Sequence, residues 1–222
     1  MSSLDDGQRA RPTRKWISLV NPRDPKMNQT CDYDVKDRTR LFQMIARCKA
    51  EGFLIHSVES GSNIWDLIMD DATGFSEQVY KFSPHFLPDN WIEEQWENGF
   101  YITAIAGDDD GSSLVVMSRG TRFHDKQVYK VCESIPYKWM ERKWKEGYSV
   151  TARASAGKKW AIVMSKGAGF SKLQVVEFDS NYPSKRIHER WDSGYDTTAM
   201  ADTADQFAFA RREPSTMIIR PR

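Results

Sequence analysis

Residues 108–111, within "GDDDGSS", gather carboxylates of the kind that hard cations favour. An EF-hand loop needs ligands at alternating positions and a glutamate at its twelfth position, and this segment has neither. An Asp-Gly pair between two strand-like stretches is instead typical of a hairpin turn. We therefore predict a turn here, and we expect no metal site and no cofactor.

The histidines, serines and glycine-containing loops lack the spacing that metal binding, nucleophilic catalysis or phosphate binding requires. The histidines form no H-x-x-x-H pair, and Ser118 and Ser165 lack the G-x-S-x-G motif that exposes a nucleophile. The loops "SRGTRF" and "SKGAGF" lack the P-loop ending and the G-x-G-x-x-G fingerprint, so we predict hairpin turns for both. The four histidines are His56, His85, His124 and His188. The sequence therefore contains no catalytic constellation.

The charge and hydropathy of the chain exclude several classes of protein. Lys and Arg number 32 against 31 Asp and Glu, so no global field collects nucleic acid or an anionic membrane. The longest apolar runs, such as "SLVVMS", have the length of a strand and not the about 20 residues of a spanning helix. The N-terminus lacks the apolar core of a secretory signal, so we expect a nuclear or cytoplasmic location. Cys31, Cys48 and Cys132 form no C-x-x-C pair and are interpreted as structural thiols.

A Gly-aromatic step recurs along the chain at nearly equal intervals of 47, 48 and 47 residues. The four steps are Gly52-Phe53, Gly99-Phe100, Gly147-Tyr148 and Gly194-Tyr195. Two other sets keep the same period, namely Met69, Met117 and Met164, and Gln78, Gln127 and Gln174. Such a period is typical of an array of supersecondary units that bury their apolar faces against one another.

Each unit has the pattern of a short helix followed by three strands. In "PDNWIEEQWENGF", Pro88 can precede the first turn, Asp89 or Asn90 can cap the helix, and Gly99 can end it. The stretches "YITAIAG", "SLVVMSRG" and "QVYKV" then read as strands. We predict a mainly β fold with short helices, in which four repeats of about 47 residues form part of a β-propeller-like array. An open α+β repeat stack is the alternative.

The repeat also predicts the domain organisation. A repeat domain covers residues 26–214, between a basic, flexible N-terminal segment (1–25) and a tail (215–222). Its units cover about residues 35–82, 83–134, 135–182 and 183–214. Because the array stops inside its fourth unit, we expect the chain to be part of a longer protein. Homo-oligomerisation through the cut end is a further hypothesis.

Aromatic residues at repeated positions are the candidate packing or interaction residues. They are Trp91, Trp96, Trp139, Trp144 and Trp191, with Phe100, Tyr148 and Tyr195. A recurring position favours interior packing, and aromatics left on one face would form a surface for protein partners. The alternative is a nucleic-acid-binding module that stacks bases on exposed aromatics and uses the basic tails, where Arg9, Arg11, Arg220 and Arg222 lie. No membrane partner is expected.

Several long motifs resemble a known family. "SGSNIWDLIMDDATGFSEQVY", "FLPDNWIEEQWENGFYITAIAG" and "ERKWKEGYSVTARASAGKKWAIVMS" are similar to the C-terminal region of plant casein kinase I-like serine/threonine kinases, the photoregulatory kinase group. The resemblance covers residues 26–214 and implies a regulatory or substrate-docking domain in phosphorylation signalling, with kinase substrates or signalling proteins as partners.

The same family places a kinase domain before this region. The present chain has no Gly-rich loop with a V-A-I-K lysine, no H-R-D loop and no D-F-G motif. No catalytic residue can therefore be transferred to any position of the chain. We predict a noncatalytic protein-interaction domain and not an enzyme.

Overall fold

A computed structural model describes residues 28–61, 63–71, 73–123, 126–168, 174–179, 189, 192, 196–202 and 207–212. Within these residues the chain forms three helices and twelve strands. In chain order they are β1 (Gln29–Val35), α1 (Arg38–Ala50), β2 (Leu54–Gly61), β3 (Ile64–Asp70), β4 (Glu77–Ser83), α2 (Asp89–Glu97), β5 (Tyr101–Gly107), β6 (Ser113–Arg119), β7 (Gln127–Cys132), α3 (Tyr137–Lys145), β8 (Tyr148–Ala156), β9 (Lys159–Lys166), β10 (Gln174–Asp179), β11 (Asp196–Asp202) and β12 (Phe207–Arg212). None of the described helices is long and apolar enough to cross a bilayer.

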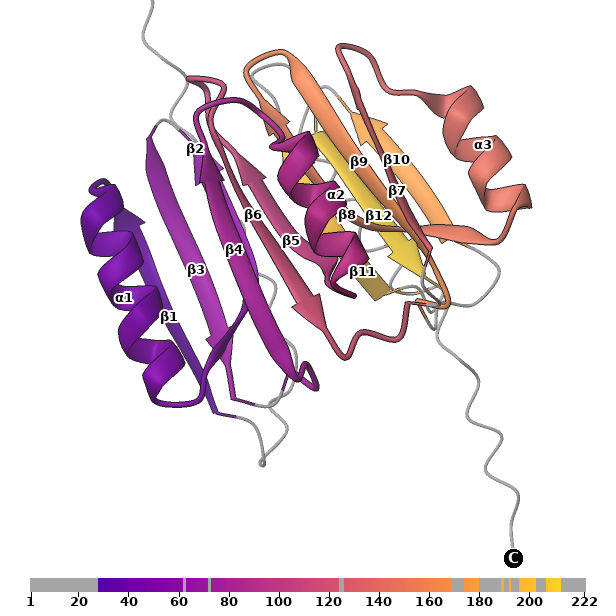
Figure 1. Ribbon diagram of the computed structural model, residues 1–222. Helices are drawn as coiled ribbons and strands as arrows, with labels where there is room; N and C mark the ends of the chain where they lie inside the picture. Colours follow the sequence, from indigo (N-terminus) through magenta and orange to yellow (C-terminus); the bar gives the residue numbers. More distant parts are fainter. Residues whose placement is uncertain are drawn as a thin grey trace, which may run out of the picture.

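The strands form four separate antiparallel sheets of three strands each (Figure 1). The first to fourth sheets have the orders β1-β3-β2, β4-β6-β5, β7-β9-β8 and β10-β12-β11. Since the outer two strands of a sheet both run antiparallel to the central one, they are parallel to each other and need a crossover connection. In the first three sheets a helix makes that crossover. The prediction of a mainly β fold with short helices is confirmed.

Each sheet begins one strand before the corresponding unit predicted from the sequence, whose boundaries fall after residues 82 and 134. "QVYKV" closes the unit 83–134 in the sequence repeat, but it lies in β7, which pairs with β9 of the third sheet. The period of a repeat fixes its length and not the point where one unit starts. The predicted hairpin turn in "SRGTRF" is wrong, because β6 is already paired on both sides, with β4 and β5, and the chain continues into β7 of the next sheet. The end of "SKGAGF", residues 169–170, lies outside the described residues.

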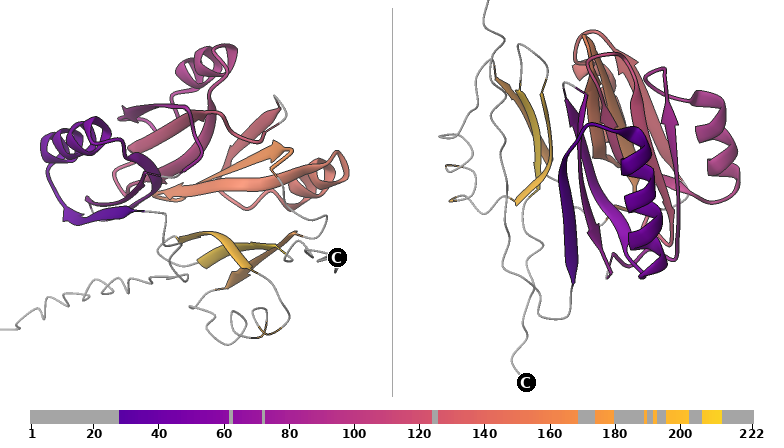
Figure 2. Two further views of the ribbon diagram at one scale, coloured as in Figure 1. Left: turned by 90° about the horizontal axis from the view of Figure 1, so that it is seen from below. Right: turned by 90° about the vertical axis from the view of Figure 1, so that its left-hand side faces the viewer.

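Neighbouring sheets meet along one row of strands. β2 lies against β5, β5 against β8, and β8 against β11. Figure 2 shows the sheets fanned out from this row, with α1, α2 and α3 on the outside. Gly107 marks how closely β5 and β8 approach, because a Cβ atom there would lie 2.3 Å from the carbonyl oxygen of Ser155. Only glycine fits this position.

The apolar core fills the spaces between sheets. Trp65 and Met69 of the first sheet pack with Leu114 and Val116 of the second in one buried cluster. A second cluster combines residues of α2, β5 and β6 with the alanines of β8. Because each sheet has only three strands, burial of this kind requires the next sheet.

Candidate interaction surface

A glutamine side chain links the first and second sheets. Gln78 of β4 donates a hydrogen bond from Nε2 to the carbonyl oxygen of Ile55 (2.9 Å) and accepts one at Oε1 from the Ile55 backbone N–H (2.7 Å). The same Nε2 also donates to Ser118 Oγ (3.0 Å). The pairing of β2 with β3 is shifted between Ile55 and Ser57, so a bulge follows Ile55. A primary amide carries both a donor and an acceptor, so it can pair with both backbone groups of Ile55.

The second and third sheets are linked in the same way. Gln127 of β7 donates to the carbonyl oxygen of Ile102 (2.9 Å) and to Ser165 Oγ (2.9 Å), and it accepts from the Ile102 N–H (2.8 Å). Its Oε1 also accepts from Trp96 Nε1 (3.1 Å). The sequence shows that the glutamines recur, but their spacing does not predict what they bind. Their partners are backbone groups beside a bulge on the neighbouring sheet, and a bulge cannot be found from spacing.

The predicted interaction aromatics that the structure describes are buried or half-buried, and Trp96 lies at the joint between the second and third sheets. Trp96 is half-buried and its ring lies 5.7 Å from that of Tyr129 on the next sheet. Phe100 and Tyr148 are buried, at 7% and 9% exposure. Trp91, Trp139 and Trp144 are half-buried and pack against the core clusters. Trp191 and Tyr195 lie outside the described residues, as do the basic segment 1–25 and the tail 215–222.

The outer face of α2 is acidic. Asp89, Glu93, Glu94 and Glu97 are exposed, and the helix contains no basic residue. The predicted cap at Asp89 or Asn90 is wrong: the helix starts after Pro88 without a side-chain cap, and Asp89 instead accepts a hydrogen bond from the Tyr129 hydroxyl (2.6 Å). Burial and this hydrogen bond raise the pKa of Tyr129.

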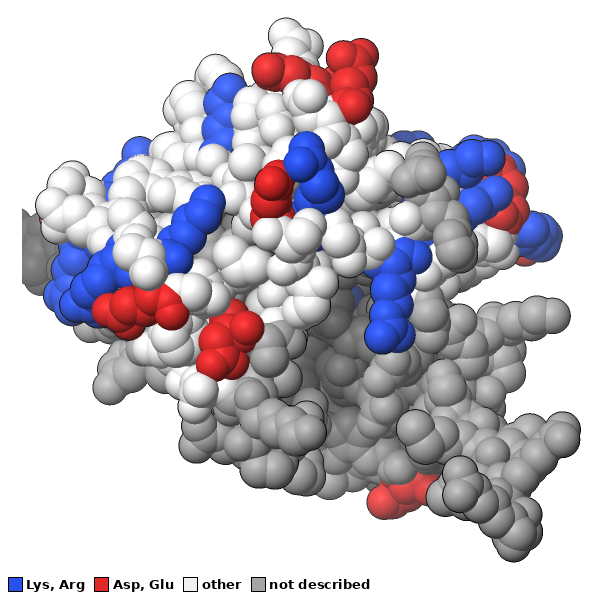
Figure 3. All heavy atoms as spheres, turned by 60° about the horizontal axis from the view of Figure 1, so that its bottom comes forward, with Lys and Arg blue, Asp and Glu red and all other residues white. Residues whose placement is uncertain are grey.

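The outer face of α3 is mainly basic, and two of its lysines form ion pairs along the helix. Lys145 bonds Glu141 (2.9 Å), and Lys143 bonds Glu146 (2.7 Å). The hydrogen bond from Lys145 lowers the pKa of Glu141. Figure 3 shows acidic side chains gathered over α2, whereas over α3 basic side chains predominate with acidic ones among them. The two helices thus present opposite charges at the same position of the repeat.

Exposed apolar side chains accompany the basic face of α3. Among the described residues, the large apolar side chains that are exposed are Ile68 (37%), Val131 (37%) and Tyr137 (55%). Val131 lies on β7, whereas Tyr137 begins α3, directly before the exposed Lys138, and Arg142 follows on the same helix. Tyr and Arg are the residue types that most often supply binding energy in protein interfaces.

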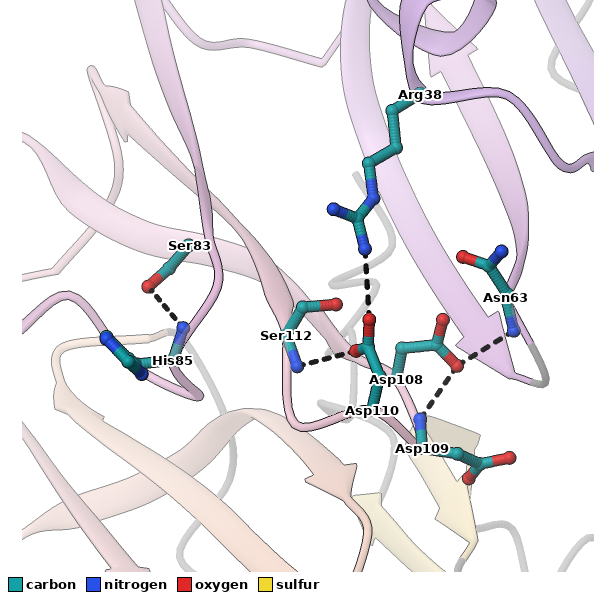
Figure 4. A network of polar contacts seen from close by, with 8 residues as sticks. All are labelled: Arg38, Asn63, Ser83, His85, Asp108, Asp109, Asp110 and Ser112. Atoms are coloured by element: carbon teal, nitrogen blue, oxygen red, sulfur yellow. Dashed lines mark hydrogen bonds and ion pairs between the residues drawn. The ribbon is translucent and has the colours of Figure 1, made fainter.

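A polar hollow is lined by residues of several loops, most of which Figure 4 shows from close by. It has a volume of about 600 Å³ and is lined by Lys36, Asp37, Arg38, Asn63, Asp108, Asp109 and Asp110. The predicted turn after residue 107 is confirmed, since residues 108–112 connect the antiparallel pair β5 and β6. No group of three or more potential metal ligands occurs in the part of the chain that the structure describes.

The histidines take no part in a shared site within the described residues. His56 Nδ1 lies 2.8 Å from Oδ2 of the buried Asp70, and the His85 backbone N–H donates to Ser83 Oγ (3.2 Å). His124 and His188 lie outside the described residues. Cys48 and Cys132 are free thiols.

Comparison with known proteins gives a family and a relative. A family model described as "Domain of unknown function (DUF7477)" matches residues 7–218. The chain belongs to this family. The Casein kinase 1-like protein HD16 of Oryza sativa subsp. japonica is 51% identical over 167 residues, which are 72% of this chain and 23% of that protein. The chain therefore spans about a quarter of its relative's length and corresponds to a region without the kinase domain, which confirms the resemblance.

Proposed function

We propose that this DUF7477 domain is a noncatalytic docking module of casein kinase 1-like proteins, and that the outer face of α3 binds an acidic segment of a protein partner. The observation that carries the proposal is the combination of exposed Tyr137 with the basic residues Lys138 and Arg142 on one helix. A tyrosine supplies contact area at low entropic cost, and the cations select a partner of opposite charge.

We further propose that the sheets are arranged radially, like part of a β-propeller, which would suit this role. The row of β2, β5, β8 and β11 would lie near the axis, and the helices would then stand on the rim, where a partner can reach them. Repeat arrays commonly bind other molecules through extended surfaces made by several units. Kinase substrates and signalling proteins in the nucleus or cytoplasm are the partners we propose.

The proposal predicts that the chain transfers no phosphate. The homologous region of HD16 lies outside the kinase domain, and the chain carries no kinase motif. Transfer of radiolabelled phosphate from ATP by a clean preparation would contradict the noncatalytic role.

The docking face can be tested by fluorescence anisotropy with a labelled Glu-rich peptide that contains one phenylalanine. We expect saturable binding, weakened about tenfold, or about 1.4 kcal/mol, by Tyr137→Ala combined with Lys138→Gln and Arg142→Gln. A matched control is Arg40→Gln with Arg47→Gln, which removes two exposed positive charges from α1 and should change the affinity less than about twofold.

An oligonucleotide of equal formal charge separates the proposal from nucleic-acid binding. If it binds more tightly than the peptide, with affinity that falls steeply as salt is raised, the domain is a nucleic-acid module and the proposal is wrong. Equal loss of peptide binding in the α1 and α3 variants would also contradict a specific docking face.

A further inference from the structure

The polar hollow is built from three loops that the fold brings together. Residues 36–37 connect β1 to α1, which Arg38 begins; Asn63 lies in the turn between β2 and β3, and residues 108–110 begin the turn between β5 and β6. The hollow thus lies where the first and second sheets meet, on a surface separate from the outer face of α3. Nothing in the proposed docking function uses it.

Asp108 is the buried member of this hollow, with an exposure of 1%. Its Oδ1 accepts hydrogen bonds from the backbone N–H groups of Asn63 (3.0 Å) and Asp109 (2.7 Å). Its Oδ2 is buried and has no hydrogen-bond partner among the described residues. Figure 4 shows this second oxygen directed toward the space between Arg38 and Asn63.

The backbone holds Asp108 in place. Gly107, the preceding residue, is packed so closely on β8 that a Cβ atom would collide with Ser155 and Phe86. The Asp108 N–H donates to the Ser112 carbonyl (2.9 Å), and its carbonyl accepts from the Gly111 N–H (3.0 Å). The main chain of Asp108 is therefore fixed, and the two hydrogen bonds to Oδ1 hold its carboxylate inward.

The guanidinium of Arg38 is already engaged elsewhere. It bonds Asp110 Oδ2 (3.0 Å) and lies over the ring of Phe82 (4.1 Å). Asp37 caps α1 by accepting from the Thr39 N–H (2.9 Å). A buried carboxylate oxygen without a donor is costly, so Asp108 Oδ2 is an acceptor ready for a donor that enters the hollow.

We propose that the hollow binds the basic side chain of a lysine or arginine on a protein partner. The entering N–H group would donate to Asp108 Oδ2. The lining contains four aspartates against one lysine and one arginine, so its field favours a cation over a neutral donor. The site would bind one basic residue of the partner, independently of the acidic segment that α3 binds.

NMR titration of the isotopically labelled chain with N-acetyl-lysine amide and N-acetyl-arginine amide tests the site. We expect saturable shifts of the Asn63 and Asp109 amide signals, because these N–H groups bond the same carboxylate. N-acetyl-glutamine amide, at matched ionic strength, should leave both signals unchanged. No saturable shift with either cationic amide would overturn the proposal.

Asp108→Asn keeps an acceptor for the two backbone N–H groups but replaces Oδ2 with a donor, so the cationic amides should bind at least about tenfold more weakly. Glu97→Gln removes the same charge from the exposed face of α2 and should leave the titration unchanged. If Asp108→Asn does not fold, the titration of the unaltered chain still decides. Saturation by spermidine but not by the amino-acid amides would indicate a polyamine site and contradict the proposal.

Discussion

The helices α2 and α3 occupy the same position in successive units, but only their core-facing sides resemble each other. Toward the core, Ile92 and Met140 are both fully buried, and Trp96 and Trp144 are both half-buried beside them. Toward solvent, α2 carries only acidic charge, whereas α3 is mainly basic. Packing against the core restricts which residues can occupy the inner side of each helix. The outer side has no such restriction, so differences in partner specificity would depend on it.

The largest effects should come from the shared inner side. Ile92→Ala and Met140→Ala should each lower the free energy of unfolding by about 2–5 kcal/mol, because both delete a fully buried side chain. Urea denaturation measures both. A cost below about 1 kcal/mol for one helix only would show that the two helices do not pack equivalently.

The second-largest loss of stability should come from replacing the glutamines that link neighbouring sheets. Gln127→Ala leaves the N–H and C=O of Ile102 without their side-chain partner, and we expect a loss of about 2–3 kcal/mol in the same denaturation measurement. Gln78→Ala should cost a similar amount, because it removes the same pair of bonds to Ile55. Gln43→Ala, on the exposed side of α1, is the control and should stay within about 0.5 kcal/mol.

The outer charges should have the smallest effect on stability, with opposite signs on the two helices. Glu97→Lys places a cation four residues after Glu93 and should raise Tm slightly. Lys145→Glu replaces the ion pair with Glu141 by a repulsion and should lower Tm slightly. Both shifts should fade in high salt, and shifts that persist would mean that these residues pack against the core.

The sequence was enough to predict a mainly β fold, the short helices and the turn that contains Gly111, because each depends on local spacing and turn chemistry. It did not predict how strands are divided among sheets, because the period of a repeat gives the length of a unit and not the strand with which a sheet begins. The role of Gln127 depends on a bulge after Ile102, and the hollow around Asp108 depends on loops from two sheets. Both require contacts between segments far apart in the chain.

The most direct test is to exchange the outer faces of the two helices and to map the Glu-rich peptide by NMR. The exchange places the side chains of one helix on the other through Asp89→Tyr, Asn90→Lys, Glu94→Arg and Glu97→Lys, with Tyr137→Asp, Lys138→Asn, Arg142→Glu and Lys145→Glu. We predict that the peptide shifts signals of α3 in the unaltered chain and of α2 in the exchanged chain. Peptide contacts that remain on α3 after the exchange would contradict docking through the outer face.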